Sequence, residues 1–249
     1  MRYSLHGGHT EFVQGANCGG RKEHIMDRLV KDAVAAKLRV LGHTVYDDTD
    51  EVGGTQSQNL NNIVRNCNSH DADLVISFHL NAYNGTANGV EVCYYDQQSL
   101  AAKVSAQLSK DIGWPNRGAK ERKELYVLAN TKAPAILIEL GFIDNESDMA
   151  KWNVDKIANS IVYALTRQTV GNVSKPTEPV NNGVRVKTGG FSDQEAAKEI
   201  LEYALARKWW VEPFVNNGEF YYITGGLYEP QLSEFEKWMK ENGWWCTRV

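Results

Sequence analysis

Hydrophobic residues along the first two thirds of the chain follow two patterns in alternation. Short apolar runs of about four to eight residues are typical of strands buried on both faces, and apolar residues that recur every three or four positions are typical of amphipathic helices. Leu74–Ile76 and Ala135–Ile138 belong to the first kind, and Glu23–Leu41 belongs to the second. This alternation predicts an α/β fold, with an open, twisted, mostly parallel sheet flanked by helices.

The same patterns predict the individual elements. Helices are expected at Glu23–Leu41, Gln56–Ser69, Leu100–Ile112 and Val154–Arg167. Strands are expected from Arg2 and at His43–Asp47, Asp73–His79, Val90–Tyr95, Leu125–Leu128 and Ala135–Glu139. The stretch Trp114–Glu124 follows neither period and is expected to be irregular. These elements place a first domain at residues 1–168.

A change of composition predicts a linker at residues 169–183, which are rich in proline, glycine and polar residues. Residues 184–249 then contain an internal repeat, because Val186-Lys-Thr-Gly-Gly-Phe191 returns as Tyr222-Ile-Thr-Gly-Gly-Leu227. Ser192-Asp-Gln-Glu195 has the form of a capping box for a helix that follows the first copy. The repeat predicts a small β-α-β-β-α-β domain of the ferredoxin-like type.

Residues with catalytic chemistry follow the ends of three predicted strands. His9, His79 and Glu139 stand at these ends, and Glu23 opens the first helix. Ligands of open α/β sheets gather beyond the carboxyl ends of the strands, so that we expect these four side chains to meet. Two histidines and one glutamate are a known ligand set for catalytic zinc, and a second carboxylate can act as the general base in the hydrolysis of an amide.

The chain resembles the zinc-dependent N-acetylmuramoyl-L-alanine amidases of the type 3 class, which occur in bacterial autolysins and phage endolysins. The resemblance covers about residues 1–168 and rests on motifs in the family's order, namely Gly8-His9, Glu23 before a long helix, Ser77-Phe-His79-Leu-Asn81-Ala82, Gly89-Val-Glu-Val, Pro134-Ala-Ile-Leu-Ile-Glu139-Leu-Gly141-Phe-Ile and Asn145-Glu-Ser-Asp148. It implies that His9, Glu23 and His79 bind one Zn²⁺ per chain and that Glu139 is the catalytic acid and base.

One motif departs from the family. The family usually has Asp-Pro-Gly-His-Gly-Gly at the first histidine, whereas this chain has His6-Gly-Gly-His9-Thr-Glu. The loop shape after His9 is therefore open at this point, and His6 is an alternative ligand. Asn81, two residues after His79, is a candidate for substrate binding.

The repeat domain resembles the SPOR domain, a wall-binding module that recognises glycan strands without peptides. Strand alternation places Arg185, Lys187, Tyr221 and Ile223 on one face of its sheet. The opposite face is expected to pack on the helices through Val184, Val186, Phe220 and Tyr222. We expect Arg185, Lys187 and Tyr221 to contact sugar. Because Ile223 lies on the same face, pairing of two sheets into a dimer is the alternative.

The composition narrows the partners and the compartment. The chain has 249 residues, 42% hydrophobic and 23% charged, with a net charge of −4, which argues against a nucleic-acid or membrane partner. Cys18, Cys67, Cys93 and Cys246 have no metal or redox spacing, so that we expect buried, reduced thiols. Since the first strand begins at the N-terminus, we expect synthesis in the cytoplasm without a signal peptide. The resemblance to phage endolysins implies release by a holin.

The sequence favours a peptidoglycan hydrolase that cleaves the amide between N-acetylmuramic acid and L-alanine, of the phage endolysin type. A zinc carboxypeptidase or endopeptidase acting on wall peptides is an alternative, because the same groups hydrolyse any amide. A bacterial autolysin and a non-catalytic wall-binding protein are the others.

Overall fold

The computed structural model divides the chain into two compact units, Met1–Gly171 and Asn172–Val249. It describes all residues except 170–182, 192–195, 197–198, 201, 205–206, 208, 210 and 217–218, and it does not describe the side chains of residues 212–220. Most of the expected linker and the expected capping box therefore lie outside the described residues. The two units are treated separately below.

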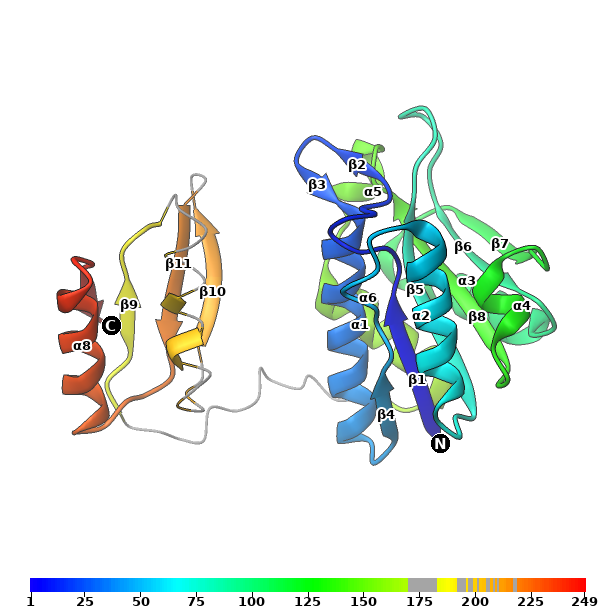
Figure 1. Ribbon diagram of the computed structural model, residues 1–249. Coiled ribbons are helices and arrows are strands. Elements are labelled where there is room, and N and C mark those ends of the chain that lie inside the picture. Colours follow the sequence, from blue (N-terminus) through cyan, green and yellow to red (C-terminus); the bar gives the residue numbers. More distant parts are fainter. Residues whose placement is uncertain are drawn as a thin grey trace. The chain divides into compact units, whose positions relative to one another are not determined.

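The first unit is built around a six-stranded sheet with the strand order β4-β1-β5-β8-β6-β7. The strands β4, β1, β5 and β8 are parallel, whereas β6 runs antiparallel to β8 and parallel to β7. Figure 1 shows the elements of this unit, which are β1 (Arg2–Gly7), β2 (Asn17–Cys18), β3 (Arg21–Lys22), α1 (Glu23–Val40), β4 (Thr44–Asp47), α2 (Gln56–Asn68), β5 (Leu74–Asn81), β6 (Val90–Tyr94), α3 (Gln98–Ile112), β7 (Asn116–Glu121), α4 (Tyr126–Asn130), β8 (Ala135–Phe142), α5 (Glu146–Met149) and α6 (Val154–Thr166). The predicted mostly parallel α/β fold is thus confirmed.

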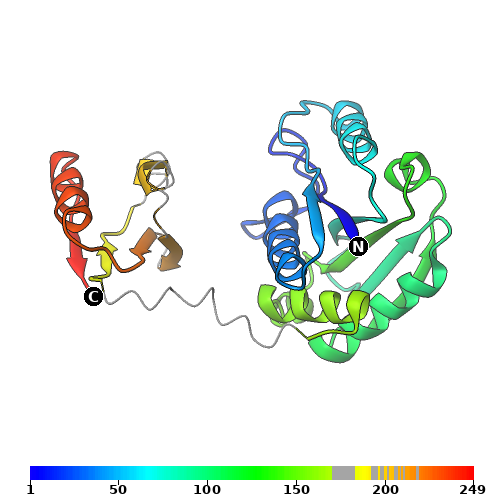
Figure 2. The ribbon, with the colours of Figure 1, turned by 90° about the horizontal axis from the view of Figure 1, so that it is seen from below.

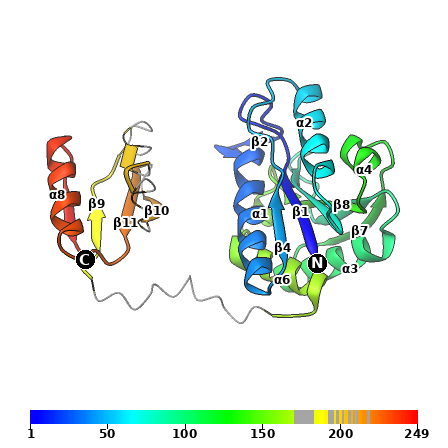
Figure 3. The same cartoon turned by 60° about the horizontal axis from the view of Figure 1, so that its bottom comes forward.

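The two faces of this sheet are buried by different helices. Along β5, Ile76 and Phe78 join one apolar cluster with α1, α3 and α6, whereas Val75 joins another with α2 and α4. Figures 2 and 3 show the sheet between these two sets of helices. Because alternate side chains of a strand point to opposite faces, the apolar run of β5 fills both clusters.

Local signals fix the helix boundaries. The side chain of Thr55 accepts a hydrogen bond from the backbone N–H of Gln58 and caps α2, and Asn153 caps α6 in the same way through Lys156. Helix α3 ends at Gly113, whose φ of 86° lies in the left-handed region. The predicted helices are therefore found close to their expected bounds.

Two sequence predictions in this unit are wrong. Residues 116–121 of the expected irregular stretch Trp114–Glu124 form the edge strand β7, which pairs with β6 on one side only. The expected strand Leu125–Leu128 contributes instead to helix α4, in which Val127 and Leu128 are buried. A short apolar run fits either a strand or one buried helical turn, and the contact with α2 decides for the helix.

All four cysteines are free, as predicted, but Cys67 and Cys93 are buried whereas Cys18 and Cys246 are half-buried. Burial raises the pKa of the Cys67 and Cys93 thiols to about 12. Within the residues that the structure describes, no helix has the length and apolar character needed to cross a membrane.

The second unit contains a four-stranded sheet with the order β10-β11-β9-β12, in which all neighbouring pairs are antiparallel. Its elements are β9 (Val186–Thr188), β10 (Val211–Asn216), β11 (Glu219–Thr224), α8 (Gln231–Glu241) and β12 (Cys246–Arg248). Between β9 and β10, residues 199–200 and 202–204 are helical. Val186 and Tyr222 face α8 in one apolar cluster, and Val184 packs against it, as the repeat predicts. The side chain of Phe220 lies outside the described residues.

Candidate metal and catalytic site

Four of the side chains singled out from the sequence lie at the same end of the large sheet. His9 follows the end of β1, and Glu23 is the first residue of α1. His79, close to the end of β5, pairs in register with Glu139 on β8. Because β1, β5 and β8 are parallel neighbours, their carboxyl ends form one edge, where open α/β sheets hold their ligands.

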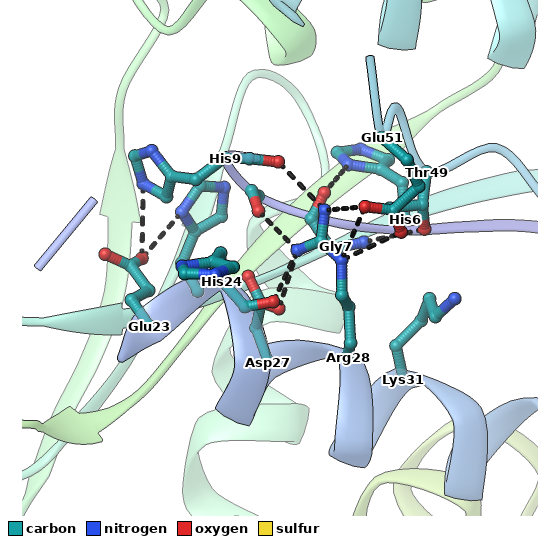
Figure 4. Close-up of polar contacts among 12 residues, drawn as sticks. His6, Gly7, His9, Glu23, His24, Asp27, Arg28, Lys31, Thr49 and Glu51 are labelled. Atoms are coloured by element: carbon teal, nitrogen blue, oxygen red, sulfur yellow. Dashed lines mark hydrogen bonds and ion pairs between the residues drawn. The ribbon is translucent and has the colours of Figure 1, made fainter. Parts of the chain in front are cut away.

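The side chains of His9, Glu23 and His79 form a compact group with one ligand-type atom each, and these atoms all lie within 4.8 Å of one another. The Nδ1 atom of His79 is 3.0 Å and the Nε2 atom of His9 is 3.4 Å from the same oxygen, Oε1 of Glu23. Figure 4 shows the imidazole ring of His9 turned towards this carboxylate. Tetrahedral zinc with bonds of about 2.1 Å separates its ligand atoms by roughly 3.4 Å, so that the spacing fits such an ion.

Two glycines leave room for this group. A Cβ atom at Gly8 would lie 2.1 Å from Cε1 of His79, and one at Gly15 would lie 2.4 Å from Oε2 of Glu23. His9 itself has a φ of 61°, in the left-handed region that side chains with a Cβ rarely adopt. The close approach of the three side chains therefore depends on the two glycines and on the left-handed backbone conformation of His9.

Glu23 is held as a buried anion. It is 3% exposed, and its two carboxylate oxygens accept hydrogen bonds from the backbone N–H of Ala16 at 2.7 Å and of Leu80 at 3.1 Å. Burial opposes its charge, but the hydrogen bonds from His79 and His9 outweigh burial and keep the pKa of Glu23 well below its ordinary value. Burial also opposes a charge on His9, but contact with Glu23 prevails and raises the pKa of that ring. The group thus presents a fixed negative charge with two nitrogen ligands.

Glu139 lines a cavity of about 350 Å³ together with His9 and His79. Its Oε2 atom is buried and has no hydrogen-bond partner among the described residues. Burial, and after it the negative charges of Glu23 and Glu91, raise the pKa of Glu139 to about 8. A carboxyl group that gains and loses its proton near neutral pH is suited to general acid and base catalysis.

The remainder of the cavity wall is mostly apolar. Its apolar residues come from the sheet, from α2 and from the region of α4, namely Leu60, Ile63, Cys93, Leu125, Tyr126, Val127 and Leu137, and Gln56 and Asn59 of α2 add polar side chains. Arg122 and Glu124 add one ion pair to the wall. A largely apolar wall limits the access of water to the reacting atoms and strengthens the electrostatic interactions between them.

His6, the alternative ligand suggested by the sequence, is not part of the three-residue group. It is fully buried on β1, and its Nδ1 atom lies 3.2 Å from the carbonyl oxygen of Gly7. Burial, with a smaller effect of His79, lowers the pKa of His6 to about 3, so that the ring is neutral. Both His6 and His9 line the cavity, but it is His9 whose ring contacts Glu23.

Asn81, a candidate for substrate binding, lies after a register irregularity that follows His79 in β5. Its side-chain amide donates a hydrogen bond of 3.4 Å to Glu91, and the other oxygen of Glu91 accepts one of 2.7 Å from Nε of Arg117. Glu91 is 7% exposed and pairs in register with Glu139. Asn81 therefore contacts Glu91, the strand neighbour of Glu139, and is not among the residues that line the cavity.

The remaining candidates lie in the second unit. Arg185, Lys187, Tyr221 and Ile223 are half-buried, whereas the alternating Val186 and Tyr222 are buried. Lys187 and Ile223 are directly paired in the sheet, and Nζ of Lys187 lies 5.1 Å from the centre of the Tyr221 ring. Nε of Arg185 donates to the carbonyl oxygen of Thr224 at 3.4 Å. The expected mixed cationic and aromatic face is thus present, and its ligand stays a prediction.

Some residues near the site were not predicted from the sequence to contribute to it. Arg28 contacts the loop of His9, and its position in the second turn of an amphipathic helix gave no sign of this. Tyr126, the first residue of α4, lines the cavity, and it was missed because Leu125–Leu128 was predicted to be a strand. Glu91 belongs to the motif Gly89-Val-Glu-Val, but no role was predicted for it. Its position as a charged residue within an apolar strand is the signal that could have found that role.

In this open α/β sheet, two histidines that contact a buried carboxylate line one cavity together with a second carboxyl group of raised pKa. This arrangement is the framework of a metal-dependent hydrolase. Comparison with known families specifies it: the chain belongs to the N-acetylmuramoyl-L-alanine amidase family Amidase_3, whose model matches residues 5–168. The solved catalytic domain of the CD27L endolysin, which targets Clostridia Difficile, is 30% identical with a TM-score of 0.63. The match covers 68% of this chain and 99% of that domain.

Curated relatives extend the comparison to whole proteins. The endolysin of Bacillus phage SPP1 is 30% identical over 273 aligned positions, which cover 93% of this chain and 96% of the endolysin. The N-acetylmuramoyl-L-alanine amidase LytC of Bacillus subtilis is 32% identical, over 58% of this chain and 30% of the relative. This chain spans 55% of a Clostridium perfringens relative of uncharacterised function and 25% of a cell wall amidase of Bacillus anthracis.

Proposed function

We propose that this protein hydrolyses peptidoglycan at the amide between N-acetylmuramic acid and the L-alanine of the stem peptide, as an endolysin. The observation that carries the proposal is the group of His9, Glu23 and His79, whose two histidines line one cavity together with Glu139. Membership in the amidase family supports the choice of bond. The similarity to a phage endolysin over nearly the whole of both chains supports a role in lysis.

We further propose one Zn²⁺ per chain, held by His9, Glu23 and His79. Two imidazole nitrogens and one carboxylate oxygen are a ligand set of catalytic zinc, which keeps a further position open. When bound, zinc would supply a Lewis acid that polarises the scissile carbonyl and makes the attacking water more acidic. The low pKa of Glu23 supports this assignment, because its charge is kept although the residue is buried.

Glu139 has the role of proton carrier. Its carboxylate takes a proton from the attacking water as the new C–O bond forms, and it returns that proton to the amide nitrogen as the C–N bond breaks. The products are the lactyl carboxylate of the sugar and the free amino group of alanine. The pKa of Glu139, which burial raises to about 8 in the metal-free protein, supports this role.

The test is analysis of the reaction products from purified cell walls. We expect new alanine amino groups and muramic acid carboxyl groups in equal amounts, no cut between two amino acids, and loss of the reaction after chelation. New amino groups on any other residue would identify a peptidase and refute the amidase proposal. The variant Glu139→Gln should lose the reaction. Its control is Glu124→Gln, because Glu124 lies on the same cavity wall but is 65% exposed.

For the second unit we propose binding to glycan strands of the wall, as in the SPOR domain that it resembles. Support comes from the sheet order of the ferredoxin-like type and from the face that carries Arg185, Lys187 and Tyr221. Attachment to the wall would raise the local substrate concentration of the first unit. Sedimentation with purified walls tests the binding proposal. The full-length variant Glu139→Gln should sediment with the walls, and adding Arg185→Ala should reduce the sedimented fraction. Unchanged sedimentation would remove this face from the proposal.

A further inference from the structure

The loop that carries His9 is held in a conformation that its own sequence does not favour. The φ of 61° at His9 lies in the left-handed region, which a residue with a Cβ rarely adopts because its Cβ comes too close to the following carbonyl oxygen. Thr10 and Glu11 follow, so that no glycine relaxes the chain after the histidine. Such strain persists only where the surrounding structure holds the backbone in place.

The guanidinium group of Arg28 supplies that support. Its Nη1 donates to the carbonyl oxygen of Gly8 at 2.9 Å, and its Nη2 donates to the carbonyl oxygen of His9 at 2.9 Å (Figure 4). Nη1 also donates to the carbonyl oxygen of His24 at 2.7 Å, within the same helix. One planar group therefore joins two consecutive peptide units of the loop to the first turns of α1, the helix that begins with Glu23.

Glu51 fixes the plane of this guanidinium. Nε of Arg28 lies 2.9 and 3.2 Å from the two carboxylate oxygens of Glu51, and Nη2 lies 3.0 Å from one of them. The side chain of Arg28 is only 14% exposed, whereas that of Glu51 is 61% exposed. Because an ion pair with so exposed a partner contributes little energy, its effect here is to orient the fork of N–H groups.

We infer that Arg28 is a positioning residue, which holds the backbone of His9 so that Nε2 faces Glu23 and His79, and thereby sets the affinity of the group for zinc. The inference rests on the zinc site of the proposed function. A lysine keeps the charge at this position but has no planar fork that could hold two adjacent carbonyls and Glu51 at once. Outer partners that orient metal ligands typically contribute 10- to 100-fold in metal affinity.

The experiment measures zinc dissociation constants by competition with a chromophoric chelator, for the full-length protein and for Arg28→Lys. We expect a constant 10- to 100-fold larger in Arg28→Lys, with one zinc still bound at saturation. Arg39→Lys is the matched control, because Arg39 lies on the same helix and donates to the carbonyl oxygen of Val45 at 3.0 Å, away from the metal-type group. Thermal unfolding of the metal-free proteins separates affinity from general stability.

A second variant tests the route of the effect. Glu51→Gln should weaken zinc binding only a few-fold, and it should add nothing in the Arg28→Lys background, because it acts through the orientation of Arg28. Wild-type affinity in Arg28→Lys, or a loss of thermal stability with unchanged affinity, overturns the inference. So does a wild-type protein that binds no zinc. A protein that binds zinc but does not cleave the muramoyl–alanine amide refutes the proposed function and leaves this result valid.

Discussion

Replacement of Glu139 by glutamine should have opposite effects on activity and on stability. Glutamine keeps the size of the side chain but accepts no proton, so that the rate of amide hydrolysis should fall roughly 10²- to 10⁴-fold. The same change removes a carboxyl group whose Oε2 is buried and has no partner among the described residues. A catalytic residue that costs stability is expected to yield a more stable and nearly inactive protein when neutralised.

The size of the gain follows from the pKa of Glu139, which is about 8 in the folded metal-free protein compared with an ordinary 4.5. Because the folded-state pKa of this acid is raised, the unfolded chain loses its proton first, and stability is lost as the pH rises from 4.5 towards 8. Between pH 4.5 and pH 7 the difference grows to roughly 3 kcal/mol, at about 1.4 kcal/mol per pH unit. Glu139→Gln should lack this loss.

Urea unfolding in the presence of a chelator provides the assay. Wild type and Glu139→Gln should have similar free energies of unfolding near pH 4, and the variant should be more stable at pH 7. Glu124→Gln should show no such gain, because its own backbone N–H and then Arg122 hold the pKa of Glu124 below its ordinary value. Parallel pH profiles for wild type and Glu139→Gln would refute the assigned burial of the carboxyl group, and full activity would refute its role as the base.

Three further predictions concern the metal and the second unit. His79→Ala should reduce the zinc content from about one per chain to near zero, measured by elemental analysis, whereas Glu139→Gln should keep it. A chain that ends at Gly171 should lose more activity on intact walls than on soluble muramoyl peptides, and equal losses would contradict a targeting role. Tyr221→Ala in full-length Glu139→Gln should reduce sedimentation with walls, and a solution mass of two chains would indicate a dimer interface instead.

The placement of the site was predictable because strand chemistry and sheet topology act together. A buried strand cannot accommodate a charged side chain without cost, so that Glu139 at the end of an apolar run was a functional candidate. Parallel neighbouring strands share one carboxyl edge, and this predicts that Glu139 and His79 lie close together. The register pairing of these two residues agrees with that reasoning.

The cavity wall was less predictable, because it depends on contacts between elements that are distant in the sequence, and the local pattern of apolar and polar residues does not encode such contacts. β7 has an edge position, and its sequence Asn-Arg-Gly-Ala-Lys-Glu shows no apolar alternation. Helix α4 has five residues, too few to display a helical period. The contacts of Arg28 with the carbonyls of Gly8 and His9 involve backbone atoms, which leave no trace in side-chain identity.

The two faces of the sheet divide stability and function between them. The face under α1, α3 and α6 is covered by the larger apolar cluster, to which β1 contributes Tyr3 and Leu5. On the other face, the side chains of His6, Ser77 and Glu139 each keep a buried polar atom with no partner among the described residues. Unpaired buried polar atoms cost free energy, and at His6 and Glu139, which line the cavity, a substrate or water can pair with them. The apolar contacts on one face therefore stabilise the same strands that carry the unpaired polar atoms of the cavity on their other face.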